Sequence, residues 1–201
     1  MVTAPDQIAR LRAALSLPGT GSSDFDLSPG VKPLAGRKLR PAGVLMPFVE
    51  TRTGLELVLT KRSSALKHHP GQIAFPGGKR DEIDTDIRAT ALREAHEEIG
   101  LNPTKVEVLG QLPEHETVTG FTVTPVLGLV TVEFTPIVEP GEVEEAFRVP
   151  FDHVADLAKF SRQGRFWQGQ MRWYETVPLG PYYIWGATAR MLRALAERLA
   201  Q

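Results

Sequence analysis

The sequence predicts an α+β protein in which helices cover both faces of a mixed β-sheet, forming an α/β/α sandwich. Two observations support this class. Several runs rich in valine, leucine and threonine have the length and composition of strands, and only a few segments have helical periodicity. Strands and helices do not alternate regularly along the chain, which argues against a doubly wound parallel sheet.

The overall composition favours one soluble domain that spans residues 1–201. The chain is 42% hydrophobic, enough for one substantial core. Its 23 basic and 24 acidic residues give a net charge of -1, so we expect no nucleic-acid partner. No apolar run reaches the roughly 18 residues of a membrane span, and no secretory signal is evident, so we expect no membrane partner and a cytoplasmic location. Cysteine is absent, which excludes disulfides and thiolate chemistry, and oligomeric state stays open.

Residues 1–40 are expected to form an N-terminal helix followed by an irregular arm. Ile8, Leu11 and Leu15 are spaced for one face of a helix over 5–17. The following segment, to about residue 41, is rich in proline, glycine and serine, so no secondary structure is assigned to it.

Two apolar runs at 42–50 and 55–62 predict a β-hairpin, and Pro47 suggests an edge strand or a bulge. Further strands are expected at 106–118 and 122–134, joined near Gly120. The remaining predictions are a glutamate-rich loop at 136–145, a short helix at 149–160, a hairpin at 164–174, a strand at 182–186 and a helix at 186–201.

The segment 71–101 carries the residues most suited to chemistry. Glu94, Glu97 and Glu98 are spaced i, i+3 and i+4, so a helix places them within an arc of roughly 100°. Three carboxylates on one face repel one another, and a hard divalent cation would relieve that repulsion. We therefore expect these glutamates to bind Mg²⁺ or Mn²⁺.

The residues before this helix are suited to binding phosphate. Gly77 and Gly78 allow the backbone to approach a ligand closely, and Lys79 and Arg80 supply positive charge. Paired glutamates on a helix are more often a solvated face, and Lys79 with Arg93 would balance such a face. The combination of glycine loop and acidic helix favours a metal-bridged phosphate or pyrophosphate site.

The Gly-Gly pair and the sequence Arg93-Glu94-Ala95-His96-Glu97-Glu98-Ile99-Gly100-Leu101 together resemble the Nudix box. In the general box the arginine follows the glycine by fourteen positions, whereas Arg93 follows Gly78 by fifteen. Asp84 occupies the position of the first acid of the box, with one extra residue after it. The alternative role for Asp84 is a helix N-cap. The resemblance implies a Nudix-type fold and identifies Glu94, Glu97 and Glu98 as metal-binding acids.

The lengthened box is similar to that of Nudix enzymes that hydrolyse coenzyme A. Supporting similarities lie at 59–78, 117–128 and 183–192. The resemblance implies a small-molecule substrate, coenzyme A or a thioester of it, cleaved at the pyrophosphate to 3',5'-ADP and 4'-phosphopantetheine. The rivals are a Nudix diphosphatase for ADP-ribose or a dinucleotide, and a catalytically silent Nudix module that binds a nucleotide.

Hydrolysis at phosphorus needs neutralised phosphate charge and a deprotonated water, which metal ions can provide. Glu94 and Glu98 are the preferred ligands, and Glu97 is a further ligand or the base. Glu142 or Glu145 from the acidic loop is an alternative base, although such glutamates often only keep a loop soluble.

The expected substrate-binding residues are Arg62, with its neighbour Lys61, together with Gln72, Gly77, Gly78, Lys79 and Arg80. A planar guanidinium suits bidentate phosphate recognition better than an ammonium. His68 and His69 are further candidates for phosphate contact. Three aromatic residues are candidates to stack on adenine or line the pantetheine path, although aromatics in apolar strands usually belong to the core: Phe75, Phe121 and Trp185.

Overall fold

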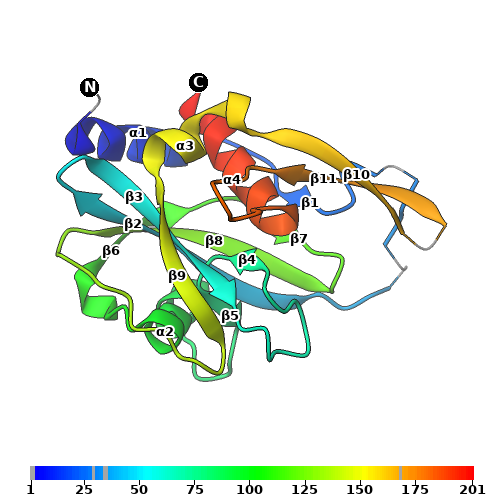
Figure 1. Cartoon of the computed structure of the whole chain (residues 1–201), viewed down its shortest axis with the longest axis horizontal. Helices are drawn as coiled ribbons and strands as arrows, with labels where there is room; N and C mark the ends of the chain where they lie inside the picture. The colour runs from blue at the N-terminus through cyan, green and yellow to red at the C-terminus, as the bar shows by residue number, and fades with distance from the viewer. Residues whose placement is uncertain (1–2, 29, 34–35, 168) are drawn as a thin grey trace.

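The computed structural model describes residues 3–28, 30–33, 36–167 and 169–201. A mixed sheet separates two helical layers, with α2 (Ile87–Ile99) beneath it and α1 (Ala4–Ser16), α3 (Phe151–Ala155) and α4 (Gly186–Leu199) above it in Figure 1. This confirms the predicted α+β sandwich.

The sheet is built around β2 (Arg40–Thr51), which runs parallel to β8 (Phe121–Val130) over ten residue pairs. On its other side β2 pairs antiparallel with β3 (Gly54–Arg62) and β5 (Gly77–Lys79). The remaining elements are β1 (Ser22–Ser23), β4 (Ile73–Ala74), β6 (Val106–Gln111), β7 (His115–Glu116), β9 (Val143–Pro150), the separate hairpin β10 (Ser161–Trp167) and β11 (Gln170–Thr176), and the 3-10 helices η1 (Pro103–Lys105) and η2 (Leu157–Lys159).

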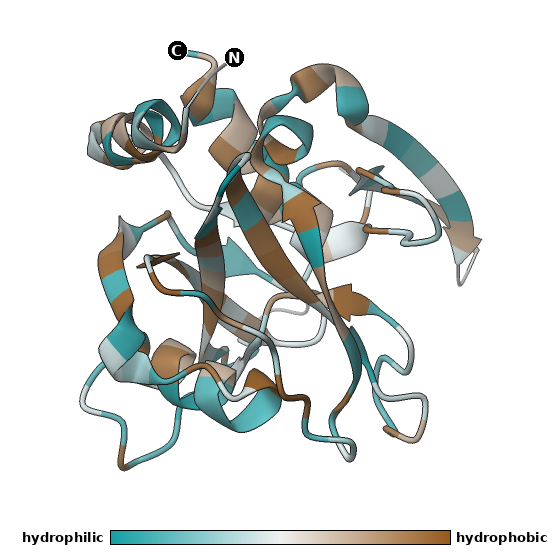
Figure 2. Ribbon diagram, turned by 60° about the vertical axis from the view of Figure 1, so that its left-hand side comes forward, coloured by the Kyte–Doolittle hydropathy of each residue, from teal (hydrophilic) through white to brown (hydrophobic). Residues whose placement is uncertain are grey.

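Alternate residues of the central strands build two cores, one on each face of the sheet. Leu45 and Val58 pack with Ala91, Ala95 and Ile99 of α2. Figure 2 shows strongly hydrophobic segments on the central strands. The opposite core is larger and includes Met46, Phe48, Leu57, Leu59, Leu11 of α1 and Leu192 of α4.

Pro47 lies in a central strand, so the predicted edge position is wrong. Along β2, backbone N–H groups point alternately to either side, and the Leu45 N–H donates to the carbonyl of Pro76 at 2.9 Å. The backbone nitrogen of Pro47 therefore points to the same side of β2 as the Leu45 N–H. That side is unpaired here, because pairing with β5 ends at Val44 and pairing with β3 begins at Phe48. A proline costs no ladder hydrogen bond in this gap.

Several predictions in the C-terminal half need correction, including the strand expected at 106–118, which is divided into β6 and β7. Strand β9 begins inside the segment expected to be a loop, and it extends through Pro150, where the short helix was expected to have begun. Residues 182–186 form isolated bridges rather than a strand. The strand expected at 122–134 ends at Val130. The 164–174 hairpin is confirmed by the β10–β11 pairing.

The N-terminal arm is also more ordered than expected, because β1 pairs in parallel with β7. The buried His115 ring joins the two segments, with Nδ1 2.9 Å from Ser22 Oγ and Nε2 3.0 Å from Asp24 Oδ1. Predictions at 29 and 34–35 lie outside the described residues. No helix in the described ranges is both long and apolar enough to cross a membrane.

Candidate functional site

The glycine pair of β5 brings the backbone directly against α2. A Cβ atom at Gly77 would lie 2.6 Å from the carbonyl oxygen of Gly43, and one at Gly78 would lie 2.5 Å from the Glu94 carboxylate. Gly77 therefore needs glycine for packing, because a Cβ there would meet backbone atoms, whereas a Cβ at Gly78 would displace only the Glu94 side chain. The close approach also leaves the backbone of Gly77 and Gly78 beside the acidic face of the helix.

Glu98 is the most deeply buried of the three glutamates, with 4% of its surface exposed. Its Oε2 accepts a hydrogen bond from the Gly77 N–H at 3.1 Å. Burial raises the pKa of Glu98 to about 8, and the Gly77 hydrogen bond offsets only part of this rise. Burial disfavours the ionised form of this carboxylate, and a bound cation would stabilise that form.

Glu94 lies one turn before Glu98 and is half-buried. Burial is also the main reason that its pKa is raised, while the adjacent Arg93 guanidinium lowers it. The negative charge of Glu142 contributes to the raised pKa of both Glu94 and Glu98. Glu142, the acid predicted from the loop, thus lies close enough to Glu94 and Glu98 for its charge to affect their pKa values.

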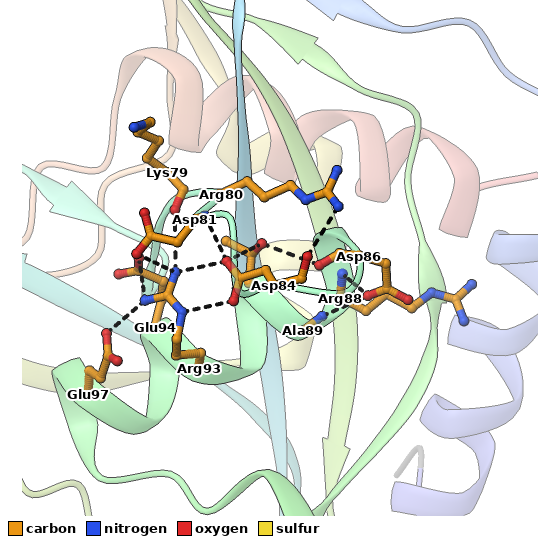
Figure 3. Close-up of polar contacts among 11 residues, drawn as sticks. Lys79, Arg80, Asp81, Asp84, Asp86, Arg88, Ala89, Arg93, Glu94 and Glu97 are labelled. Carbon is orange, nitrogen blue, oxygen red and sulfur yellow. Dashed lines mark hydrogen bonds and ion pairs between the residues drawn. The ribbon is translucent and has the colours of Figure 1, made fainter.

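Arg93 organises the acidic face, as Figure 3 shows. Its Nε and Nη2 bind the two carboxylate oxygens of Asp84 at 2.9 and 3.0 Å. Its Nη1 binds Glu94 at 3.0 Å and Glu97 at 2.9 Å. Asp84 is buried, and the Arg93 guanidinium holds its pKa well below the usual range. Arg93 therefore fixes the loop and the helix relative to each other.

Asp86, rather than Asp84, is the N-cap of α2. Asp86 Oδ1 accepts hydrogen bonds from the N–H groups of Arg88 and Ala89, each at 2.9 Å (Figure 3). The N-cap interpretation of Asp84 is wrong, and Asp84 instead pairs with Arg93. The extra residue after Asp84 is accommodated before the helix begins.

The other predicted substrate residues differ in what they contact. Arg62 lowers the pKa of Glu98 through its positive charge, and its Nε is buried without a hydrogen-bond partner among the described residues. Arg80 instead donates to the carbonyls of Asp84 and Thr85 at 3.1 and 3.2 Å. Lys79 is exposed at the edge of the loop. Among the predicted substrate-binding cations, Arg62 is thus the one whose charge acts on Glu98.

Lys61 and Gln72 lie on a neighbouring cavity of about 510 Å³ rather than beside the glutamates. Lys61 pairs with Glu144 at 2.6 Å, and Gln72 Oε1 lies 2.9 Å from His69 Nδ1. Residues that the sequence did not single out also line the cavity, namely Pro70, Pro181, Tyr182 and Tyr183, next to the predicted Trp185 and Glu145.

The remaining two aromatic candidates lie elsewhere. Phe75 is buried in the core. Phe121 lies beneath the guanidinium of Arg40, with 4.0 Å from Arg40 Cζ to the ring centroid. Neither contributes to the cavity lining.

The family model for the NUDIX domain matches residues 39–168, which include the glycine loop, the acidic helix and most of the sheet. The chain belongs to the Nudix hydrolase family. It is 40% identical over 165 residues to the uncharacterized Nudix hydrolase NudL of Enterobacter sp. (strain 638), covering 80% of this chain and 83% of that protein. NudL of Cronobacter sakazakii is 38% identical over 167 residues, with 81% and 84% covered.

Two solved structures support the Nudix fold. The Nudix hydrolase RenU of M. smegmatis has a TM-score of 0.50 and 24% identity, covering 61% of this chain and 83% of RenU. The NUDIX domain of Shewanella oneidensis NrtR, crystallised with ADP ribose, has a TM-score of 0.51 and 18% identity, covering 85% and 95%. At these identities the similarity concerns the fold alone.

Nudix enzymes generally use divalent metals, and the donors present here suit such an ion. Within the described residues, no three acidic or histidine side chains converge closely enough to form a complete metal site. Mg²⁺ usually takes only one or two carboxylates and completes its shell with water and substrate phosphate. The buried Glu98 and half-buried Glu94 provide that minimum, whereas Glu97 is half exposed; Arg93 pairs with both Glu94 and Glu97.

Proposed function

We propose that this Nudix hydrolase cleaves the pyrophosphate of coenzyme A or its thioesters with Mg²⁺ or Mn²⁺, giving 3',5'-ADP and 4'-phosphopantetheine or its acyl derivative. The observation that carries the hydrolytic part is the juxtaposition of Glu94 and Glu98 with Gly77 and Gly78. It puts two carboxylates suited to a divalent metal directly beside the glycine loop.

Each residue has a distinct task in this proposal. Glu94 and Glu98 would hold the metal, with Glu97 as a further ligand or as the base. A divalent ion bound there would supply charge neutralisation for the phosphate and a lowered pKa for water. Glu97 or Glu142 takes the proton from the attacking water. The guanidinium of Arg62, with its unpartnered Nε, binds a phosphate oxygen.

The preference for coenzyme A is supported by the sequence around the box. The additional residue between Gly78 and Arg93 resembles the box of the coenzyme A subgroup, and the segments 59–78, 117–128 and 183–192 are similar to stretches of that subgroup. Two of these segments meet in the fold, because Gln72 and Tyr183 line the same cavity. The proposed phosphate-binding loop is completed by Gly77, Gly78 and the exposed Lys79. Arg80 stabilises this loop by donating hydrogen bonds to the carbonyls of Asp84 and Thr85.

A substrate panel tests the specificity. Coenzyme A, an acyl-coenzyme A, ADP-ribose and a dinucleoside polyphosphate are each incubated with Mg²⁺ or Mn²⁺, and products are identified by mass spectrometry. We expect coenzyme A species to have the highest kcat/KM. Preferential turnover of ADP-ribose or the dinucleotide would assign the protein to a different diphosphatase, and no turnover of any compound would indicate a silent binding module.

Glu98→Gln tests the site itself. It is expected to remove metal-dependent turnover while the circular dichroism spectrum stays native, because the amide keeps the shape and loses the charge. Glu82→Gln is the matched control, since Glu82 is exposed. Near-normal activity of the Glu98→Gln variant would exclude Glu98 from metal binding.

A further inference from the structure

The 510 Å³ cavity lies beside the carboxylate site, across the end of β3. Its walls come from Lys61, from Pro70 to Ile73, from Glu145 and from residues 181–185. Its volume is comparable to that of small-molecule pockets, and it is partly open to solvent. None of the residues assigned to metal binding lines the cavity, so it is distinct from the metal site.

One wall of the cavity is aromatic and is fixed by contacts behind it. The Tyr182 ring stacks on Phe147, with centroids 3.6 Å apart and planes inclined by 5°. Its hydroxyl donates to Glu145. Trp185 meets Tyr174 edge-on, with centroids 5.1 Å apart. Because contacts already hold these rings in place, little side-chain entropy is lost when a ligand packs on them.

Tyr183 is the ring most available to a ligand, with 47% of its surface exposed. It lies between Tyr182 and Trp185 in sequence and lines the same cavity. Gln72, Lys61 and Glu145 add amide, ammonium and carboxylate groups to the lining. Rings together with a few polar groups suit a flat heteroaromatic ligand with polar edges, because such a ligand can stack and form hydrogen bonds.

Short connections link the cavity to the groups around Glu98. Lys61 lines the cavity, and the next residue, Arg62, acts electrostatically on Glu98. The β3–β9 register shifts here, since Lys61 faces Glu145 while Arg62 faces Val143. Backbone hydrogen bonds of Arg62 with Gly71 and Gln72, at 3.1 and 2.9 Å, fix the cavity floor to the same strand end.

We propose that this cavity binds the adenine nucleotide half of the substrate, with the base packed on Tyr183 beside Trp185 and the pyrophosphate extending towards Gly77 and Gly78. This assignment rests on the proposed function, which identifies the rest of the substrate as 4'-phosphopantetheine. That part of the substrate then extends away from the cavity. Pantetheine is a flexible chain and gains little from stacking, whereas a flat purine base gains binding free energy by stacking on an aromatic ring.

Binding of the two product halves to the metal-free protein tests this assignment. Isothermal titration calorimetry with 3',5'-ADP and with 4'-phosphopantetheine is carried out on wild type, Tyr183→Ala and Tyr183→Phe. Tyr183→Ala is expected to weaken 3',5'-ADP binding about tenfold, the effect of losing one stack, and to leave 4'-phosphopantetheine affinity within about twofold. Tyr183→Phe keeps the ring and should retain most of the affinity.

Phe166→Ala is the matched control, because Phe166 is 69% exposed on the β10–β11 hairpin and does not line the cavity. Thermal melts of each variant establish that it is folded. The proposal is overturned if Tyr183→Ala weakens 4'-phosphopantetheine instead, if it leaves 3',5'-ADP binding unchanged, or if wild type shows no saturable binding of 3',5'-ADP.

The same variants separate this inference from the proposed function. If coenzyme A is not hydrolysed but 3',5'-ADP and ADP-ribose bind through Tyr183, the adenine site stands and the coenzyme A assignment fails. If coenzyme A is hydrolysed and Tyr183→Ala leaves its KM unchanged, the proposed function stands and the adenine site fails.

Discussion

The Arg93–Asp84 pair holds the glycine loop on the acidic helix. The bidentate contact joins a buried carboxylate to a guanidinium whose other nitrogen holds Glu94 and Glu97. Sequence reasoning left the role of Asp84 open, because one extra residue separates it from Arg93. Spacing cannot show how a loop absorbs an insertion. The structure shows that the chain turns to Asp86 before the helix starts.

Asp84→Asn should lower the free energy of unfolding by roughly 3 kcal/mol at pH 7, because it leaves Arg93 without its buried partner. Asp84 has a lowered pKa in the folded state and an ordinary one, about 3.9, when unfolded. Its stabilisation is therefore complete above about pH 4 and is lost as the pH falls further. Urea unfolding at pH 7 and pH 3 measures this.

Asp81→Asn is the control for that prediction, since Asp81 lies 3.7 Å from Arg93 and is half exposed. It should change stability by less than about 1 kcal/mol. Equal effects of the two substitutions, or an Asp84→Asn effect that does not shrink at pH 3, would contradict the role given to Asp84.

Glu98 should make the metal-free protein less stable as the pH rises. Its pKa is about 8 when folded and near 4.5 when unfolded, so between these values the folded state binds more protons than the unfolded state. Stability then falls with rising pH across that window and levels off above it. Glu98→Gln removes this dependence and should be more stable than wild type at pH 8.5, on the order of 2 kcal/mol.

Chemical denaturation in EDTA at pH 5 and pH 8.5 measures that difference. Glu97→Gln serves as the comparison, because Glu97 is half exposed. Adding Mg²⁺ should narrow the gap at pH 8.5 by stabilising wild type alone. A Glu98→Gln variant that is less stable than wild type at pH 8.5 in EDTA would show that the buried carboxylate is not destabilising.

At the level of elements, β5 and α2 form one unit because the loop has no side chains where they meet. Gly78→Ala would put a Cβ atom 2.5 Å from the Glu94 carboxylate. We expect the fold to survive, because Glu94 can rotate away, and kcat/KM to fall at least tenfold because the carboxylate leaves its place. Gly141→Ala is the control, since its Cβ would make only an ordinary 3.7 Å contact.

Steady-state kinetics with a range of Mg²⁺ concentrations distinguishes the cause. Displacement of Glu94 should raise the metal concentration needed for half-maximal activity in Gly78→Ala and leave it unchanged in Gly141→Ala. A Gly78→Ala enzyme with normal activity and normal metal dependence would mean that the Glu94 position is not required.

The acidic helix was predictable because it follows local rules of periodicity, whereas strand partners are not local. Strand β9 was missed because its glutamates suggested a solvated loop, and only pairing with β3 makes it a strand. Residues 182–186 were predicted as a strand from their aromatic composition. They instead pass through two isolated bridges and supply the cavity wall.

In the whole molecule, the sheet separates the acidic site from the parts that join the chain ends. α2 lies on one face, and α1 packs with α4 on the other (Figure 1). Gln7 of α1 accepts a hydrogen bond from the Leu55 N–H at 2.7 Å, and Arg198 of α4 donates to the carbonyls of Ala14 and Leu17 at 2.9 and 2.7 Å. The sequence predicted the first and last helices but contained no sign that they pack on each other, because that contact spans the chain.

Leu11→Ala should therefore reduce stability without impairing catalysis. Leu11 is completely buried, and its truncation should cost roughly 2–5 kcal/mol. Calorimetry should show a lower Tm, and kcat/KM measured well below that Tm should stay within about twofold of wild type, because Leu11 lies in the core on the opposite face of the sheet from α2. Ile83→Ala, at a residue that is 80% exposed, should change neither quantity. A large loss of kcat/KM in folded Leu11→Ala would mean that the two faces of the sheet are coupled.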